Sequence, residues 1–144
     1  MTRLKRSAKS KPRDRRPSSP ADELESFRRQ FEMPLDREIS YAVKVLYEAG
    51  IETSESCEGG DGHSFPEPTV QFFGDGAEGY RAVTIALQFG LPVSDLRRVW
   101  SVIGSELTGP HWEMTFSPRS RLVEVQRQAE EPTSPLRKHV VPSR

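Results

Sequence analysis

A pattern of one helix followed by two strands occurs twice in the middle of this 144-residue chain, and it limits the folds that the chain can adopt. In each half an amphipathic helix ends at a glycine, Gly50 or Gly90, that is followed by a branched apolar residue. A glycine at this position adopts the left-handed backbone conformation that ends many helices. Each half then closes on an aromatic strand led by proline, at residues 68–73 and 110–116. The order predicts an αββαββ chain. The similarity of its two halves would result either from an internal duplication or from the same helix-and-strand preferences acting in each half.

The spacing of apolar residues locates the individual elements. A short helix is expected to begin at Ser19 and to end before Pro34. The other predicted elements are a helix at 36–50 capped by Asp36, strands at 51–56 and 69–73, a helix at 78–89, and strands at 96–103 and 111–117 joined by a turn at 104–110. A helix that begins at Asp95–Val99, capped by Ser94, is the alternative to the third strand.

These elements predict an α+β fold. The expected architecture is a two-layer sandwich, with a four-stranded, mainly antiparallel sheet and the two main helices on one face. The helix at 78–89 is apolar around much of its circumference and is expected to be deeply buried. Trp100 and Trp112 are expected to lie in the core rather than to serve as base-stacking platforms.

The charged residues divide the chain into three parts, although the formal net charge is zero. Residues 1–20 carry eight Lys and Arg side chains and one acid, whereas residues 21–131 carry ten basic and twenty acidic residues. We expect a disordered basic tail at 1–20, one α+β domain at 21–118, and a mostly disordered C-terminal tail at 119–144. The basic tail is either a nonspecific nucleic-acid contact or a solubilising segment.

The cysteine content and hydropathy indicate a cytoplasmic location. A single cysteine excludes an internal disulfide and fits a reducing compartment. The sequence has no run of 18 apolar residues, so neither a membrane span nor membrane attachment is expected. The basic N-terminus lacks the apolar stretch of a secretory signal.

The densest group of chemically active residues lies in the connection between the first two predicted strands. This connection, residues 56–68, holds the only cysteine, one of three histidines and three closely spaced glycines. It is the candidate site for a ligand or a protein partner. Its candidate residues are Ser56, Cys57, Glu58, Gly59, Gly60, Asp61, Gly62 and His63.

One interpretation of this loop is a divalent metal site. Cys57 and His63 offer ligand atoms, and His111 could approach from the second pair of strands. Zinc sites generally need three or four protein ligands, so two residues in the loop are too few by themselves. The surrounding carboxylates and the lack of Lys or Arg between residues 51 and 80 favour a cation.

Three other interpretations remain open. The glycine N–H groups could cradle an anion, but the loop carboxylates oppose a phosphate unless Arg81, Arg97 or Arg98 converges on it. Cys57 could act as a nucleophile with His63 or His111 as its base, although neighbouring glutamates oppose the thiolate. The plainest interpretation is structural: the glycines give a long connection its freedom, and Cys57 packs as a small apolar residue.

Two motifs resemble those of a family of small bacterial and phage-associated proteins, of a kind also found on mobile elements, to which no activity is assigned. They are the loop T-x-x-S-C-x-G-G-x-G-H at 53–63 and the strand G-P-x-W-E-M-T-F at 109–116. The resemblance covers residues 36–117 and implies a compact domain. A weaker similarity links residues 54–59 to the Ser-Ser-Cys-Ser-Gly-Arg element of wybutosine-type tRNA methyltransferases, but Gly60 replaces the arginine, so methyltransferase activity is not inferred.

The sequence therefore predicts a small binding or regulatory module more than an enzyme. One alternative is a metal-dependent or thiol enzyme that uses Cys57 and His63. The other is a nucleic-acid-associated protein tethered by residues 1–20.

Overall fold

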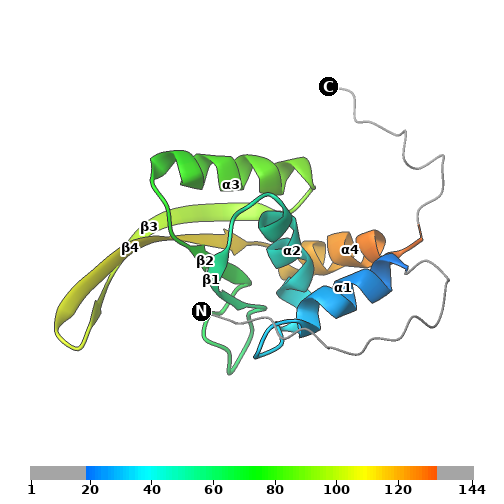
Figure 1. The fold of residues 1–144 in the computed structure, drawn as a ribbon, viewed down its shortest axis with the longest axis horizontal. Helices are drawn as coiled ribbons and strands as arrows, with labels where there is room; N and C mark the ends of the chain where they lie inside the picture. The colour runs from blue at the N-terminus through cyan, green and yellow to red at the C-terminus, as the bar shows by residue number, and fades with distance from the viewer. Residues whose placement is uncertain (1–18, 133–144) are drawn as a thin grey trace, which may run out of the picture.

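The fold is a two-layer α+β sandwich, as the sequence predicts (Figure 1). The computed structural model describes residues 19–132. The predicted disorder of residues 1–18 and 133–144 falls outside this range. The described elements are α1 (Pro20–Arg29), the 3₁₀-helix η1 (Arg37–Ile39), α2 (Ser40–Glu48), β1 (Thr53–Cys57), β2 (Thr69–Phe72), α3 (Gly76–Gln88), β3 (Val93–Ile103), β4 (Glu106–Phe116) and α4 (Arg119–Glu130).

The four strands form one antiparallel sheet in the order β1-β2-β4-β3. Side chains alternate between its two faces, so one set points toward the helices and the other toward solvent. The inner face is fully buried at the centre of the sheet, where it is formed by Val70, Phe72, Met114 and Phe116. The outer face is polar there, and Gln71 Nε2 donates to Glu113 Oε2 at 2.9 Å. Helices α2 and α3 cover the apolar face and exclude water from it.

The hairpin of β3 and β4 is longer than its sequence indicates. Its turn consists of Gly104 and Ser105 only, and not of residues 104–110 as expected. Both residues have positive φ, +57° and +69° respectively, which is the geometry of a two-residue hairpin turn that matches the twist of the strands. The alternative helix at Asp95–Val99 is wrong, because these residues pair with β4 throughout.

Helix α3 is less buried than its composition suggests. Only small residues of the helix, Gly79, Ala82 and Ala86, are buried. A Cβ atom on Gly79 would lie 2.6 Å from the Trp112 ring, so the helix packs on the sheet through this glycine. Leu87 is 55% exposed, and Trp100, also expected in the core, is 57% exposed. Trp112 packs against the core as predicted.

Helix α4 corrects the predicted end of the domain at residue 118. Leu122 and Val125 are buried, and Gln126 Nε2 donates to the carbonyl of Arg37 at 2.9 Å. The helix has only this short apolar stripe, and its burial depends on α1 and η1, which lie about ninety residues earlier in the chain. The domain therefore extends through Glu130.

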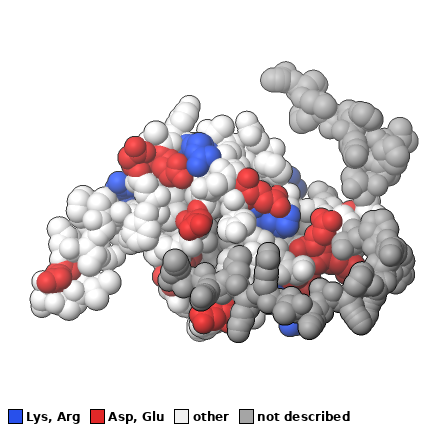
Figure 2. Space-filling model, viewed as in Figure 1, with Lys and Arg blue, Asp and Glu red and all other residues white. Residues whose placement is uncertain are grey.

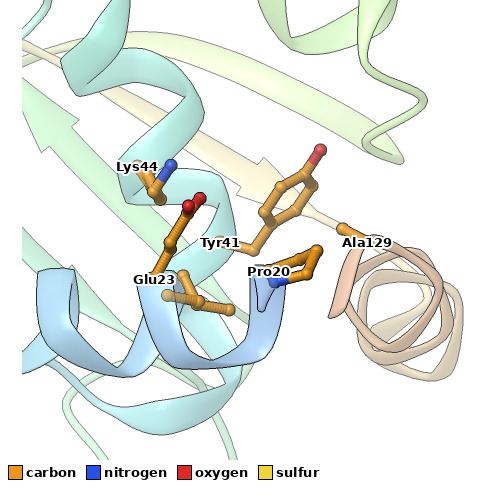
Figure 3. A pocket seen from close by; sticks show the side chains of 6 residues that line it. Pro20, Glu23, Tyr41, Lys44 and Ala129 are labelled. Carbon is orange, nitrogen blue, oxygen red and sulfur yellow. The ribbon is translucent and has the colours of Figure 1, made fainter. Parts of the chain in front are cut away.

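A hollow of about 80 Å³ lies where α1, α2 and α4 meet. Figure 3 shows its lining, which comes from all three helices: Pro20, Glu23, Leu24, Tyr41, Lys44 and Ala129. Burial, with a smaller effect from Glu48, raises the pKa of the Tyr41 hydroxyl. The hollow is much smaller than the roughly 300–1,000 Å³ of ordinary small-molecule sites. It reflects imperfect packing of three helices.

Among residues 19–132, no helix combines the length and the apolar character needed to cross a membrane. The cytoplasmic location stays a prediction.

The Leu122→Ala substitution tests whether α4 belongs to the domain. We expect it to lower the free energy of unfolding by about 2–4 kcal/mol, because Leu122 is 1% exposed and its loss leaves a cavity. Chemical denaturation followed by circular dichroism measures this. Ser120→Ala, at an exposed position of the same helix, should change stability by less than about 0.5 kcal/mol. Equal, small effects of both substitutions would contradict the packing described.

Candidate functional site

Three potential metal ligands converge beside the connection between β1 and β2. Cys57 ends β1, His63 lies in the connection itself, and Asp36 precedes η1. Cys57 Sγ lies 3.7 Å from His63 Nδ1, and Asp36 Oδ2 lies 3.9 Å from the same nitrogen. The three ligand atoms lie within 4.8 Å of one another. Cys57 is buried, whereas about one third of the His63 and Asp36 side chains is exposed, so the group opens to solvent on one side.

The loop reaches this shape through its glycines. Gly59, with φ of +83°, passes so close to the returning chain that a Cβ atom would lie 2.6 Å from the Glu67 and Pro68 backbone. Gly60 N–H then donates to the carbonyl of Pro66 at 3.0 Å, and His63 N–H donates to that of Gly60 at 3.1 Å. These contacts fold residues 59–67 back on themselves and bring His63 to Cys57.

Two carboxylates tie the loop to η1 in a reciprocal manner. Glu58 N–H donates to Asp36 Oδ2 at 3.0 Å, and Glu38 N–H donates to Glu58 Oε1 at 2.9 Å. Asp36 is therefore not the side-chain cap that the sequence suggests, since it makes no hydrogen bond to its own helix. The Asp36 carboxylate is turned instead toward the loop, and the hydrogen bond from Glu58 N–H fixes its orientation.

Arg119 of α4 joins the loop to the C-terminal helix. It donates to Glu38 Oε1 through Nη2 at 2.7 Å and to the carbonyl of Gly59 through Nη1 at 3.2 Å. The hydrogen bond to Glu38 raises the pKa of this guanidinium, and the charges of Glu38 and Glu58 add to the effect. Because Glu38 already balances Arg119, the arginine does not turn the loop into an anion site.

The structure places the other candidate residues in different surroundings. His111 lies on β4, with its ring centroid 6.2 Å from that of Phe73, and is not a member of the Cys57 group. The imidazole Nε2 of His111 is buried and accepts or donates no hydrogen bond within residues 19–132. Asp61 and Gly62 are exposed at the loop tip, while Ser56 and Gly60 are half-buried.

The arginines that could have completed a phosphate cradle make contacts away from the loop. Arg81 donates to the carbonyl of Ala49, Arg97 pairs with Asp95, and Arg98 stacks over the Trp112 ring. Arg119 is the arginine that reaches the loop. The sequence does not predict this contact, because Arg119 lies sixty residues after Gly59.

The geometry distinguishes between two chemistries for Cys57, His63 and Asp36. In a nucleophilic triad, the nucleophile and the orienting carboxylate contact opposite nitrogens of the imidazole. Here the thiol and the carboxylate both face Nδ1, and the thiol is only 5% exposed. A thiol, an imidazole nitrogen and a carboxylate oxygen around one point are instead typical of a metal site that has three protein ligands and a free coordination position.

Comparison of the chain with protein-family models, curated proteins and solved structures finds no match. The resemblance to small bacterial and phage-associated proteins stays a prediction.

Two glycine substitutions test the close approach that shapes the loop. Gly59 and Gly62 have almost the same φ, +83° and +82°, but only Gly59 lies against another part of the chain. Alanine at either position carries the same backbone strain of about 1 kcal/mol. We expect Gly59→Ala to cost at least about 1 kcal/mol more than Gly62→Ala, measured by chemical denaturation. Equal costs would show that the Gly59 contact does not constrain the loop.

Proposed function

We propose that the protein is a small binding module that holds a divalent transition-metal ion of the Zn²⁺ type between the loop at residues 56–68, which supplies Cys57 and His63, and Asp36. The observation that carries the proposal is the convergence of a thiol, an imidazole nitrogen and a carboxylate within 4.8 Å. Zn²⁺ accepts this mixture of sulfur, nitrogen and oxygen ligands.

The spacing of the ligand atoms supports this assignment. Tetrahedral Zn²⁺ with ordinary bond lengths places its sulfur, nitrogen and oxygen ligands about 3.4–3.6 Å apart. The separations of 3.7 Å and 3.9 Å measured from His63 Nδ1 exceed this range by a few tenths of an ångström, and the third pair, Cys57 and Asp36, lies within 4.8 Å. Rotation of the partly exposed His63 side chain would bring its ring nitrogen closer to the other two ligands.

Hydrogen bonds to the ligands support it further. Gly59 N–H points at Cys57 Sγ at 3.4 Å, and Glu58 N–H holds Asp36 Oδ2 at 3.0 Å. Such outer contacts orient metal ligands and stabilise the thiolate. With three protein ligands, the fourth position would be left to water or to a group from a partner.

Metal binding at this site would join segments that are distant in the sequence. Asp36 belongs to the segment before η1, Cys57 to β1 and His63 to the loop, while Arg119 links the same loop to α4. A ligand that binds only the folded state stabilises that state. The ion would therefore act mainly as a structural or regulatory clamp, which fits a binding module better than an enzyme.

Metal titration of the full chain tests the proposal. Protein purified without chelator is examined by native mass spectrometry, then stripped and titrated with Zn²⁺ and with Co²⁺, whose absorption reports thiolate coordination. We expect one ion per chain and a higher melting temperature with Zn²⁺. Cys57→Ser and His63→Ala should each weaken Zn²⁺ binding by more than the roughly 10- to 100-fold that outer contacts contribute. Lowering the pH should weaken binding, because protons compete for the thiolate and imidazole.

Asp61→Asn provides the matched control, since Asp61 is an exposed carboxylate of the same loop outside the group of three. It should bind Zn²⁺ as the unchanged protein does, whereas Asp36→Asn should bind it more weakly. Absence of binding, or binding that the three substitutions at Cys57, His63 and Asp36 leave intact, would overturn the proposal.

A thiol enzyme is the second candidate, favoured by the contact between Cys57 and His63. It predicts rapid alkylation of metal-free protein by iodoacetamide at neutral pH, with a rate that His63→Ala reduces. The burial of Cys57 and the shared imidazole nitrogen argue against it. Slow alkylation that His63→Ala does not change would remove this candidate.

Nucleic-acid association through the basic tail stays a prediction from the sequence. Its residues 1–18 lie outside the part of the chain that the structure describes.

A further inference from the structure

One edge of the sheet is long and carries no neighbour among residues 19–132. β3 pairs with β4 on one side only, and the other side of this eleven-residue strand leaves backbone N–H and C=O groups without a strand neighbour. Register shifts between Val93 and Asp95 and between Val99 and Ser101 make residues 95–99 its regular stretch. Such an edge is a template for another strand. The opposite edge strand, β1, has only five residues, and its polar sequence Thr-Ser-Glu-Ser-Cys makes it a poor template. The two edges therefore differ in what they can bind.

The helix above β3 presents an apolar flank over this edge. Arg81 Nη1 donates to the carbonyl of Ala49 at 2.7 Å, so its side of α3 faces α2. At 100° per residue, Tyr80, Val83 and Leu87 lie on the other flank. Tyr80 is 78% exposed and Leu87 is 55% exposed. Figure 1 shows α3 over β3 with no other described element on its outer side.

Beyond α3 the same hairpin continues as an arm, residues 99–110, that projects past the helices (Figure 1). Glu106 is the only Asp, Glu, Lys or Arg in this range, and the far part of the arm is largely white in Figure 2. Seven of the ten large apolar residues that are exposed in residues 19–132 lie on α3, the turn after it or the arm: Tyr80, Leu87, Phe89, Trp100, Val102, Ile103 and Leu107. Clustering of this kind marks an interaction surface.

The charged residues of β3 can pair with the same residues of a second copy of the strand. Asp95 and Arg97 lie on the same face of the strand and already pair within the chain, with Arg97 Nε 2.8 Å from Asp95 Oδ2. If two β3 strands run antiparallel with Leu96 opposite Leu96, each Asp95 faces Arg97 of the other copy. A surface that pairs opposite charges with itself suits a twofold axis.

We propose that β3 is the interface of a homodimer, in which the β3 strands of two copies pair antiparallel about Leu96 to form a continuous eight-stranded sheet. The edge, the helix flank and the charges all meet at this axis. Leu96 points to the α3 side of the sheet, as does its neighbour on β4, Met114. The Tyr80, Val83 and Leu87 flank of one copy then packs on the same flank of the second.

The arm gains a partner from the same register. Antiparallel pairing about Leu96 directs the arm of one copy, with Trp100, Val102 and Ile103, toward the turn of the second copy that carries Phe89. This turn directly precedes β3 in the chain, and its Phe89 is exposed in the single chain. The proposal thus brings the exposed apolar groups of α3, of the turn and of the β3 part of the arm to one symmetric contact.

Sedimentation velocity of the full chain over a wide range of concentrations tests the dimer. We expect a dimer fraction that rises with concentration. Leu87→Glu should raise the dissociation constant at least about 30-fold, because the change occurs twice in a twofold interface. Met33→Glu is the matched control: Met33 is 80% exposed, lies after α1 and should leave the dimer unchanged. Circular dichroism establishes that each variant is folded.

A charge swap tests the register. Arg97→Asp and Asp95→Arg should each weaken the dimer, whereas the double variant should restore it, since the opposite charges again face each other across the axis. A monomer at every concentration overturns the proposal. So does a dimer that Leu87→Glu and both single charge reversals leave intact, because it would use another surface.

Discussion

The pairing of β2 with β4 is the constraint on which the remaining structure depends. β2 has only four residues, and its partners on β4 lie 40 to 46 residues further along the chain. Its Val70 and Phe72, together with Met114 and Phe116 of β4, form a completely buried apolar surface. Burial of such side chains contributes about 1.5–3 kcal/mol each, and it is available only when both strands and the covering helices are in place. The long loop before β2 can therefore be polar and glycine-rich without loss of the fold.

Much of this fold follows from local sequence patterns. The alternation in residues 111–117 identifies β4, and the glycine after each apolar helix locates the ends of α2 and α3 within one or two residues. The features that the sequence did not predict correctly depend on partners far away in the chain. α4 has a short apolar stripe that becomes informative only when α1 and η1 supply a surface for it. Trp100 is a residue type expected in a core, yet the hairpin carries it beyond the helices.

The candidate site shows the same division between local and distant information. Cys57 and His63 are close in sequence, and their residue types alone single them out. Asp36 lies twenty-one residues before Cys57 and carries the ordinary signature of a helix cap, so no local pattern distinguishes it from one. Only the reciprocal hydrogen bonds of Glu58 and Glu38 reveal that its carboxylate faces the loop. Arg119, similarly, has no motif around it.

The position of Arg119 has a consequence for the order in which the protein is built. α4 is the last described element to leave the ribosome, yet it donates to Gly59 and to Glu38, and its Gln126 holds Arg37. A nascent chain that has emerged only as far as β4 contains all four strands, but the loop at 58–67 and η1 still lack these contacts. The loop that carries His63 is therefore held by fewer contacts until the whole domain has emerged.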